Sequence, residues 1–288
     1  MGQQRNGHAL DREVPLHMPS VRFGMSKRGI IVSMPYPASH FRLSMFSQCR
    51  HRYKLHYVDD LAEVYRKPRP YLTMGEHVHA ALRALFSLPV EERSEERLIE
   101  LMRDRWRKNR EGFADLAEEK LYGERATAQL RRFAQRENLT AQPLAVEDFH
   151  KVEVDEGLAL LGKIDRVDRD GAGLHIIDYK TGAPREPDPL QLQMYGLIVA
   201  RKFDPTPIRA SYHYLETGEW ITQAATEETM DQALEDVRQQ VAVIVAEREY
   251  PAEPGPLCGY CDFLEICREG KGFVPSHPAA PEGAPPWE

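Results

Sequence analysis

The sequence predicts a mixed α/β fold in which a helical block precedes a central mixed sheet flanked by helices. Apolar residues recur at helical spacing through 73–138, and period-two alternation begins after Pro143. Helical spacing returns over 189–202 and 227–249, on either side of a second predicted hairpin. With 288 residues and 42% hydrophobic content, the chain can bury the core that this fold requires.

A capping box marks the start of the helical block. Thr73 is followed three residues later by Glu76, so we expect a helix to begin at Thr73. Gly112 and Gly123 are expected to break the block into separate helices. The first of these helices carries a predicted buried stripe of Val78, Leu82 and Leu85.

Three strands follow, separated by tight turns at 155–157 and 170–173, where Asp and Gly cluster. The predicted strands and the elements after them are strands 144–154, 159–168 and 174–180, a helix over 189–202, a hairpin of 208–215 and 220–224, and an amphipathic helix over 227–249. Together, residues 144–250 make up the predicted functional core.

The two ends of the chain are expected to lie outside the single domain of residues 39–270. Residues 1–38 carry scattered Gly, Pro and His without sustained periodicity, which predicts a flexible segment. Residues 271–288 are rich in proline and predict a disordered tail.

Charge and hydropathy narrow the class of protein. The formal net charge is −7, which opposes nucleic-acid binding by an evenly charged surface, but basic residues cluster at 50–54, 66–69 and 103–110. The run at 103–110 has the pattern of a solvated helix face, whereas 50–54 is a candidate for phosphate contact. No apolar stretch is long enough for a membrane span and no secretory signal is evident, so we expect a cytoplasmic protein without a membrane partner.

Acidic and basic side chains converge on the predicted strands. Asp165 and Asp178 lie on neighbouring strands, and their carboxylates are ligands that Mg²⁺ prefers. Asp178 and Lys180 are one residue apart, so both side chains project from the same face of the strand. The Tyr179 side chain points to the opposite face, but its backbone carbonyl could still be a metal ligand. The pattern indicates metal-assisted hydrolysis of a phosphodiester.

The same residues carry a resemblance to a known family. The segments are Gly162 to Arg166, Asp178-Tyr179-Lys180-Thr181-Gly182, Gln191 to Tyr195, and Gly75 with His79. Their order and spacing resemble the PD-(D/E)xK nuclease superfamily, and within it the RecB-like branch. The resemblance implies a restriction-endonuclease-like core and a deoxyribonuclease that depends on Mg²⁺ or Mn²⁺ and acts on single strands or DNA ends, in DNA repair, recombination or CRISPR-type processing.

The resemblance also implies roles for individual residues. His79, Asp165 and Asp178 would hold the metal ion together with the Tyr179 carbonyl, and Glu147 lies near the place where some members have another acidic group. Lys180 would assist the nucleophile. The remaining motif residues, Gln191 and Tyr195, would position Lys180 and the DNA backbone.

Four cysteines form a second pattern. Cys258, Cys261 and Cys267 are close together, whereas Cys49 lies far upstream, at the end of a short helix predicted from Ser39 onward. Zinc sites usually pair cysteines in two short knuckles, so three close ligands and one remote ligand favour a [4Fe–4S] cluster. This layout is similar to that of AddB nucleases and of the cluster-bearing CRISPR adaptation nucleases. A zinc site and four reduced cysteines without metal remain alternatives.

Several other interpretations stay open. His79 alone could be a core histidine, Asp165 could form a surface ion pair with Arg166, and Gln191 with Tyr195 are ordinary helix neighbours. The chain as a whole could be a catalytically silent DNA-binding scaffold with the same fold, or an iron–sulfur electron-transfer protein. No Gly-x4-Gly-Lys-Ser/Thr loop is present, so any unwinding would come from a helicase or another subunit of a nuclease complex acting in trans.

Overall fold

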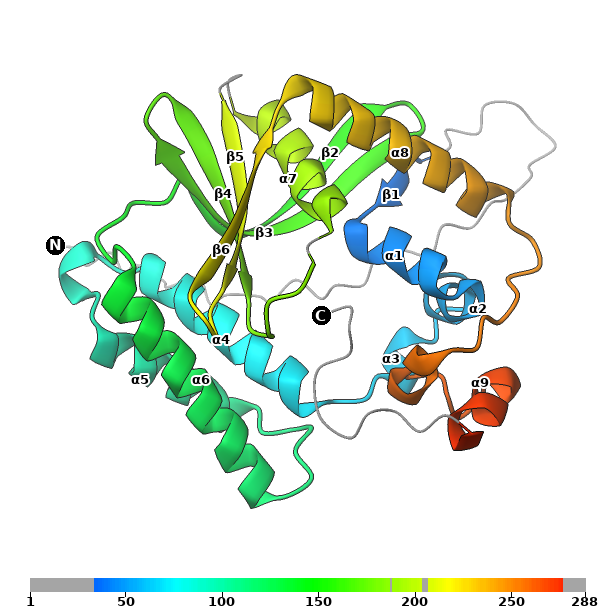
Figure 1. The fold of residues 1–288 in the computed structure, drawn as a ribbon, viewed down its shortest axis with the longest axis horizontal. Coiled ribbons are helices and arrows are strands. Elements are labelled where there is room, and N and C mark those ends of the chain that lie inside the picture. Colours follow the sequence, from blue (N-terminus) through cyan, green and yellow to red (C-terminus); the bar gives the residue numbers. More distant parts are fainter. Residues whose placement is uncertain (1–33, 187, 204–206, 277–288) are drawn as a thin grey trace, which may run out of the picture.

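The computed structural model describes residues 34–186, 188–203 and 207–276, and a six-stranded sheet lies between two helical layers (Figure 1). One layer consists of α1 (His40–Gln48), α7 (Pro189–Lys202) and α8 (Glu227–Ala246). The other consists of α4 (Pro70–Phe86), α5 (Glu95–Lys108) and α6 (Leu116–Arg136). The expected fold class, a central mixed sheet flanked by helices, is confirmed.

The sheet mixes parallel and antiparallel pairs in the order β1-β3-β4-β5-β6, with β2 also paired to β3. The pairs β1–β3 and β4–β5 are parallel and the other pairs are antiparallel. The strands are β1 (Tyr36–Ala38), β2 (Ala145–Asp155), β3 (Leu158–Asp170), β4 (Gly173–Lys180), β5 (Ile208–Tyr214) and β6 (Glu219–Ala225). All five strands expected after Pro143 are present within a few residues of their predicted ends.

The strand β3 is shared between different partners along its length. β2 pairs with nearly all of it, whereas β1 pairs only with 158–160 and β4 only with 166–170. Residues 161–165 therefore lie between the end of one ladder and the start of the next. Backbone groups in such a gap need partners from side chains or solvent, and this place in the sheet is where the candidate site forms.

Two hydrophobic clusters hold the layers to the sheet. The first joins α1, α7 and α8 to one face, with Ile164, Ile176 and Ile198 almost completely buried. The second joins α4, α5 and α6 to the other face, around Val78, Leu82 and Leu85. The stripe predicted for the first helix of the block is therefore confirmed.

Helix boundaries in the block differ from the predicted ones. α4 begins at Pro70, a residue that suits the first helical position, and the Thr73 hydroxyl donates to the Glu111 carbonyl instead of capping a helix. Gly123 lies inside α6, because the roughly 1 kcal/mol that a mid-helix glycine costs is outweighed by packing of the helix. Gly112, with φ of 92°, lies in the loop between α5 and α6, so the helical block is interrupted there as predicted.

Ordered structure also extends further than predicted at both ends of the domain. β1 occupies 36–38, inside the segment expected to be flexible, because its backbone pairs with β3. Helix α9 (Arg268–Phe273) and a 3₁₀ turn (Val274–Ser276) occupy the beginning of the expected disordered tail. Residues 1–33 and 277–288, for which flexibility and disorder were predicted, lie outside the described residues.

The cysteine-rich segment near the C-terminus packs against residues that follow Cys49 (Figure 1). The Phe263 side chain is 2% exposed and contacts the Tyr65 ring, at the end of α3 (Ala62–Tyr65). The Arg69 guanidinium lies 2.8 Å from the Asp262 carboxylate and donates to the Tyr260 carbonyl at 2.6 Å. Distant parts of the chain are thus joined by ordinary side-chain contacts.

In the part of the chain that is described, no helix is long and apolar enough to cross a membrane.

Candidate metal-dependent active site

Asp165 lies in the gap between the two ladders of β3. Its Oδ2 accepts a hydrogen bond of 2.8 Å from the Tyr179 backbone N–H, so the carboxylate satisfies a β4 group beyond the paired residues. Its Oδ1 lies 3.0 Å from His79 Nδ1. Burial alone would raise the pKa of Asp165, but the His79 imidazole holds that pKa below its ordinary value. Asp165 is therefore an ionised, buried carboxylate.

Helix α4 delivers His79 to this carboxylate. Gly75, one turn earlier, lies so close to the end of β4 that a Cβ atom there would be 3.3 Å from Thr181 Oγ1. The small residue lets α4 approach the strand. Burial lowers the pKa of His79, yet the charge of Asp165 outweighs it and the pKa is raised overall. Asp165 thus favours the protonated imidazole, and a bound divalent cation would compete with that proton.

Glu147 completes a group of three potential metal ligands. One ligand atom from each of His79, Glu147 and Asp165 lies within 4.8 Å of the others. Glu147 occupies a left-handed backbone conformation, with φ of 45°, in β2. Its carboxylate also contacts Arg83 at 3.0 Å and Lys163 at 2.9 Å. Two carboxylates and one imidazole are a donor set that fits a divalent cation with open positions.

Asp178 and Lys180 project from the same face of β4, as their spacing indicated. Lys180 Nζ lies 2.7 Å from Asp178 Oδ2, but that buried oxygen has no partner with hydrogen-bond geometry. Burial raises the pKa of Asp178, Lys180 offsets this only in part, and the nearby Asp165 raises it further. A buried carboxylate beside a second carboxylate favours the binding of a cation there.

A hydrogen-bond network holds Lys180 from the side of α7. Lys180 Nζ donates to Gln191 Oε1 at 3.1 Å, and Gln191 Nε2 donates to the Tyr195 hydroxyl at 3.2 Å. The Tyr212 hydroxyl lies 3.0 Å from Gln191 Oε1, and Lys180 Nζ lies 4.7 Å from the centre of the Tyr212 ring. The lysine is fixed by a carboxylate, an amide and an aromatic face.

The structure brings most of the sequence-predicted residues together, with two qualifications. Among the described residues, Asp178 is not a member of the group of three clustered ligands, although its pairing with Lys180 and its electrostatic interaction with Asp165 place it beside that group. His79, Asp165, Asp178, Lys180 and Gln191 converge through the contacts above. Tyr179 turns its side chain to the opposite face, where it is 4% exposed in the second hydrophobic cluster. Its backbone N–H is engaged by Asp165, and the role of its carbonyl as a metal ligand stays a prediction.

Sequence reasoning missed one member of the site and undervalued another. Tyr212 stands directly opposite Asp178 in the β4–β5 ladder, a register that follows only from the parallel pairing of these strands. The signal available in the sequence was the alternation Tyr212-His213-Tyr214 at the end of a predicted strand. Glu147 was matched only loosely to the family pattern, yet its carboxylate is one of the three clustered ligands.

The four cysteines lie in a second region. All are partly buried and none forms a disulfide. Backbone N–H groups of Arg52, Gly255 and Gly270 donate to the sulfurs of Cys49, Cys258 and Cys267 at 3.3–3.5 Å. A side chain at Gly270 would meet both Cys258 Sγ and Cys267 Sγ, at 3.5 and 3.4 Å. Burial raises the pKa of the Cys261 and Cys267 thiols.

Comparison with known proteins agrees with the geometry. The family model described as PD-(D/E)XK nuclease superfamily matches residues 37–268. The match covers most of the chain, and the protein belongs to the PD-(D/E)XK nuclease superfamily. No curated protein matches the chain.

Two solved structures show the extent of the similarity. The crystal structure of a "Putative exonuclease" from Eubacterium rectale is 13% identical, with a TM-score of 0.50 over 84% of this chain and 93% of that one. This likeness shows the shared fold. The crystal structure of SSO0001 is 19% identical, with a TM-score of 0.28 over 53% of this chain and 79% of that one.

Proposed function

We propose that this nuclease is a Mg²⁺- or Mn²⁺-dependent deoxyribonuclease that acts as an exonuclease on single strands or DNA ends. The observation that carries the proposal is the meeting of His79, Glu147 and Asp165 ligand atoms within 4.8 Å, beside an Asp178–Lys180 pair. The name of the structural neighbour from Eubacterium rectale describes an exonuclease, which supports the choice of reaction.

Each residue of the site has a separate role in the proposed reaction. The carboxylates of Asp165 and Asp178, Glu147 and the deprotonated His79 would hold the cation, with the Tyr179 carbonyl as a further ligand. A bound divalent ion polarises the phosphate and lowers the pKa of water. Lys180 orients the attacking water and offsets charge that develops on the phosphate oxygens, while Gln191 and Tyr195 keep its ammonium in place.

End-labelled and circular DNA, each single- or double-stranded, distinguish the possible activities. With Mn²⁺ we expect release of nucleotides from linear substrates and survival of circles. Lys180→Ala should lower the rate by about 10²–10³-fold, the size of effect seen when one charge-stabilising group is removed. Lys151→Ala, an exposed lysine on β2, is the matched control. A folded, metal-loaded protein that cleaves none of these substrates would favour the silent scaffold, and cleavage of circles would identify an endonuclease.

We further propose that Cys49, Cys258, Cys261 and Cys267 bind a [4Fe–4S] cluster, as in the RecB-like and AddB-like branch. The backbone N–H groups directed at the sulfurs suit thiolate ligands, which they stabilise.

Iron and sulfide analysis of protein purified without oxygen tests this proposal. Cys261→Ala should lose the brown absorbance of the cluster and lower the melting temperature, because the cluster closes a very long loop between Cys49 and Cys258. Zinc in place of iron in the wild-type protein would rule out the cluster. We also propose that unwound DNA is supplied by a helicase or another nuclease subunit acting in trans, in repair, recombination or CRISPR-type processing.

A further inference from the structure

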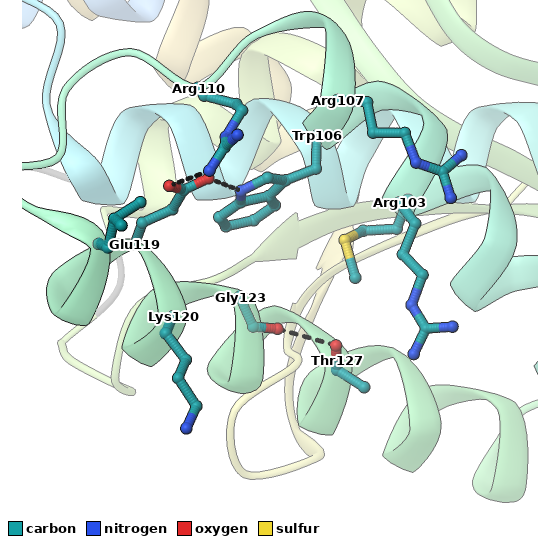
Figure 2. Close-up of a pocket in the computed structure, with 10 residues that line it drawn as sticks. Arg103, Trp106, Arg107, Arg110, Glu119, Lys120, Gly123 and Thr127 are labelled. Carbon is teal, nitrogen blue, oxygen red and sulfur yellow. Dashed lines mark hydrogen bonds and ion pairs between the residues drawn. The ribbon is translucent and has the colours of Figure 1, made fainter.

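An open cavity lies away from the carboxylates, in a groove between α5 and α6. Its volume is about 520 Å³, and Figure 2 shows basic side chains of both helices around it. Arg103, Lys120, Gly123 and Thr127 line both this cavity and an adjoining one that continues the groove to Arg131. None of the residues that line this groove belongs to the metal-ligand group described above.

The charge of the groove is opposite to that of the whole chain. Its basic lining residues are Arg103, Arg107, Arg110, Lys120 and Arg131, against Glu119 and Glu124 as acidic ones. The chain overall has a net charge of −7. A local excess of cations on an acidic protein creates a field that attracts a polyanion to this surface and repels it from others.

Part of this charge is structural and part is free to bind. Glu119 accepts hydrogen bonds from Arg110 at 2.6 and 2.7 Å and from Trp106 Nε1 at 3.0 Å, which fixes one end of the groove (Figure 2). Lys120 reaches Glu124 only at 3.8 Å. Arg107 and Arg131 also pair with carboxylates outside the lining, Asp104 at 2.5 Å and Glu95 at 3.4 Å. Arg103 is exposed, and its guanidinium has no ion pair or hydrogen bond among the described residues. Exposed pairs such as that of Lys120 contribute about 1 kcal/mol or less, so Lys120 and Arg103 can both turn to a ligand.

Apolar side chains lie between the cations. Trp106 lines the groove and stacks on Phe113, with ring centres 5.5 Å apart and planes within 16°. Leu116, also in the lining, is 74% exposed. The Trp106 ring is held by Phe113 and His77, so the exposed Leu116 and the cations are the groups open to a ligand. Cations beside an exposed apolar side chain suit single-stranded nucleic acid, in which phosphates and unstacked bases are both available.

Helix α6 connects the groove to the catalytic strand. Gln129 Nε2 donates to the Thr181 carbonyl at 2.9 Å, directly after Lys180. On the same helix, Lys120 and Arg131 are separated by roughly 16 Å, the rise of the intervening turns, which spans several nucleotides of an extended strand. A strand of the DNA substrate matches the length and the charge of the groove and its position next to the active site.

We propose that the α5–α6 groove is an auxiliary binding site for the phosphate backbone of single-stranded DNA, which holds the part of the strand that lies outside the active site. This inference rests on the proposed nuclease function. It assigns a role to the 103–110 basic run, for which a solvated helix face was the expectation from sequence.

The test measures DNA binding separately from cleavage. Fluorescent thymidine oligonucleotides of increasing length are titrated in EDTA, which removes divalent metal, at several salt concentrations. The variant is Arg103→Gln/Lys120→Gln, and the control is Lys151→Gln/Arg238→Gln, which removes two half-exposed cations from β2 and α8. Thermal melts establish that both variants are folded.

We expect the groove variant to bind long strands about tenfold more weakly, with a smaller loss for short ones, and the control to match the wild type. The slope of log affinity against log salt should fall by about 1.4, because each phosphate contact on a single strand contributes about 0.7. Equal affinities and slopes for a folded groove variant would overturn the proposal. The proposal would also be overturned if the groove variant bound an acidic peptide, such as oligoglutamate, more weakly than the wild type but bound DNA equally well, since that result identifies a peptide site.

Binding and cleavage assays together distinguish failure of the groove proposal from failure of the proposed nuclease function. If wild-type protein binds DNA through the groove but cleaves nothing with Mn²⁺, the groove stands and the nuclease function falls. If it cleaves DNA and the groove variant binds and cleaves long strands like the wild type, the nuclease stands and the groove falls.

Discussion

Replacement of Asp165 by asparagine separates metal binding from folding. In the structure the carboxylate accepts the Tyr179 N–H at 2.8 Å and contacts His79 Nδ1 at 3.0 Å. An asparagine of the same shape can keep its carbonyl on Tyr179 and donate its amide to a neutral His79. The substitution therefore removes one negative charge next to Asp178 and preserves the hydrogen bonds.

The expected magnitude follows from ligand linkage. At a metal concentration one hundred times the dissociation constant, wild-type protein gains about 2.7 kcal/mol. For a domain of this size that gain raises the melting temperature by about 5–10 °C. Asp165→Asn should lose this shift and its cleavage activity. In EDTA its stability should stay within about 1 kcal/mol of the wild type or rise, because Asp165 repels the buried Asp178.

Thermal melts with Mn²⁺ or EDTA, paired with calorimetric metal titration, measure both effects. Asp148→Asn, an exposed carboxylate on β2, serves as the control and should keep the full metal-induced shift. If Asp165→Asn melts with the same metal-induced shift as the wild type, the cation is not held by this carboxylate, and the arrangement of ligands proposed above is wrong.

Three further predictions concern neighbouring positions. A Cβ atom at Gly162 would lie 2.8 Å from Ile198 Cδ1 and 3.1 Å from the Tyr195 ring, so Gly162→Ala should destabilise the protein by about 1–3 kcal/mol and slow turnover, with metal affinity unchanged in calorimetry. Tyr212→Phe removes a hydroxyl 3.0 Å from a glutamine oxygen of the lysine network and should lower kcat about tenfold with little change in KM; equal kcat would show that the hydroxyl does not position the lysine. Burial, followed by the charge of Arg166, lowers the pKa of His213 to about 4. The unfolded chain therefore binds the proton first, and the contribution of His213 to stability is lost as pH falls from 6.5 towards 4, by up to about 3 kcal/mol. Since the pKa values of His56 and His175 are lowered in the same way, His213→Phe should reduce but not abolish the loss of stability between pH 7 and pH 5 in urea melts, and an unchanged loss would contradict the assignment.

Local patterns in the sequence determined most of the fold and the main members of the site. Alternation and turn residues located β3 and β4, and the one-residue spacing of Asp178 and Lys180 placed both on one strand face. These features depend on the backbone geometry of a few neighbouring residues, which the sequence carries directly. Helix ends were less predictable, because packing of α6 tolerates Gly123 and Pro70 starts α4 ahead of the apparent cap.

Only the tertiary structure decided how distant segments meet. The division of β3 between β1 and β4 opens the gap that Asp165 fills, and the parallel register of β5 brings Tyr212 opposite Asp178. The approach of α4 at Gly75 brings His79 to the carboxylate. Likewise, the basic run at 103–110 becomes a groove only where α6 packs beside it. Such juxtapositions arise from burial of apolar faces across the whole domain, a non-directional force that no short stretch of sequence encodes.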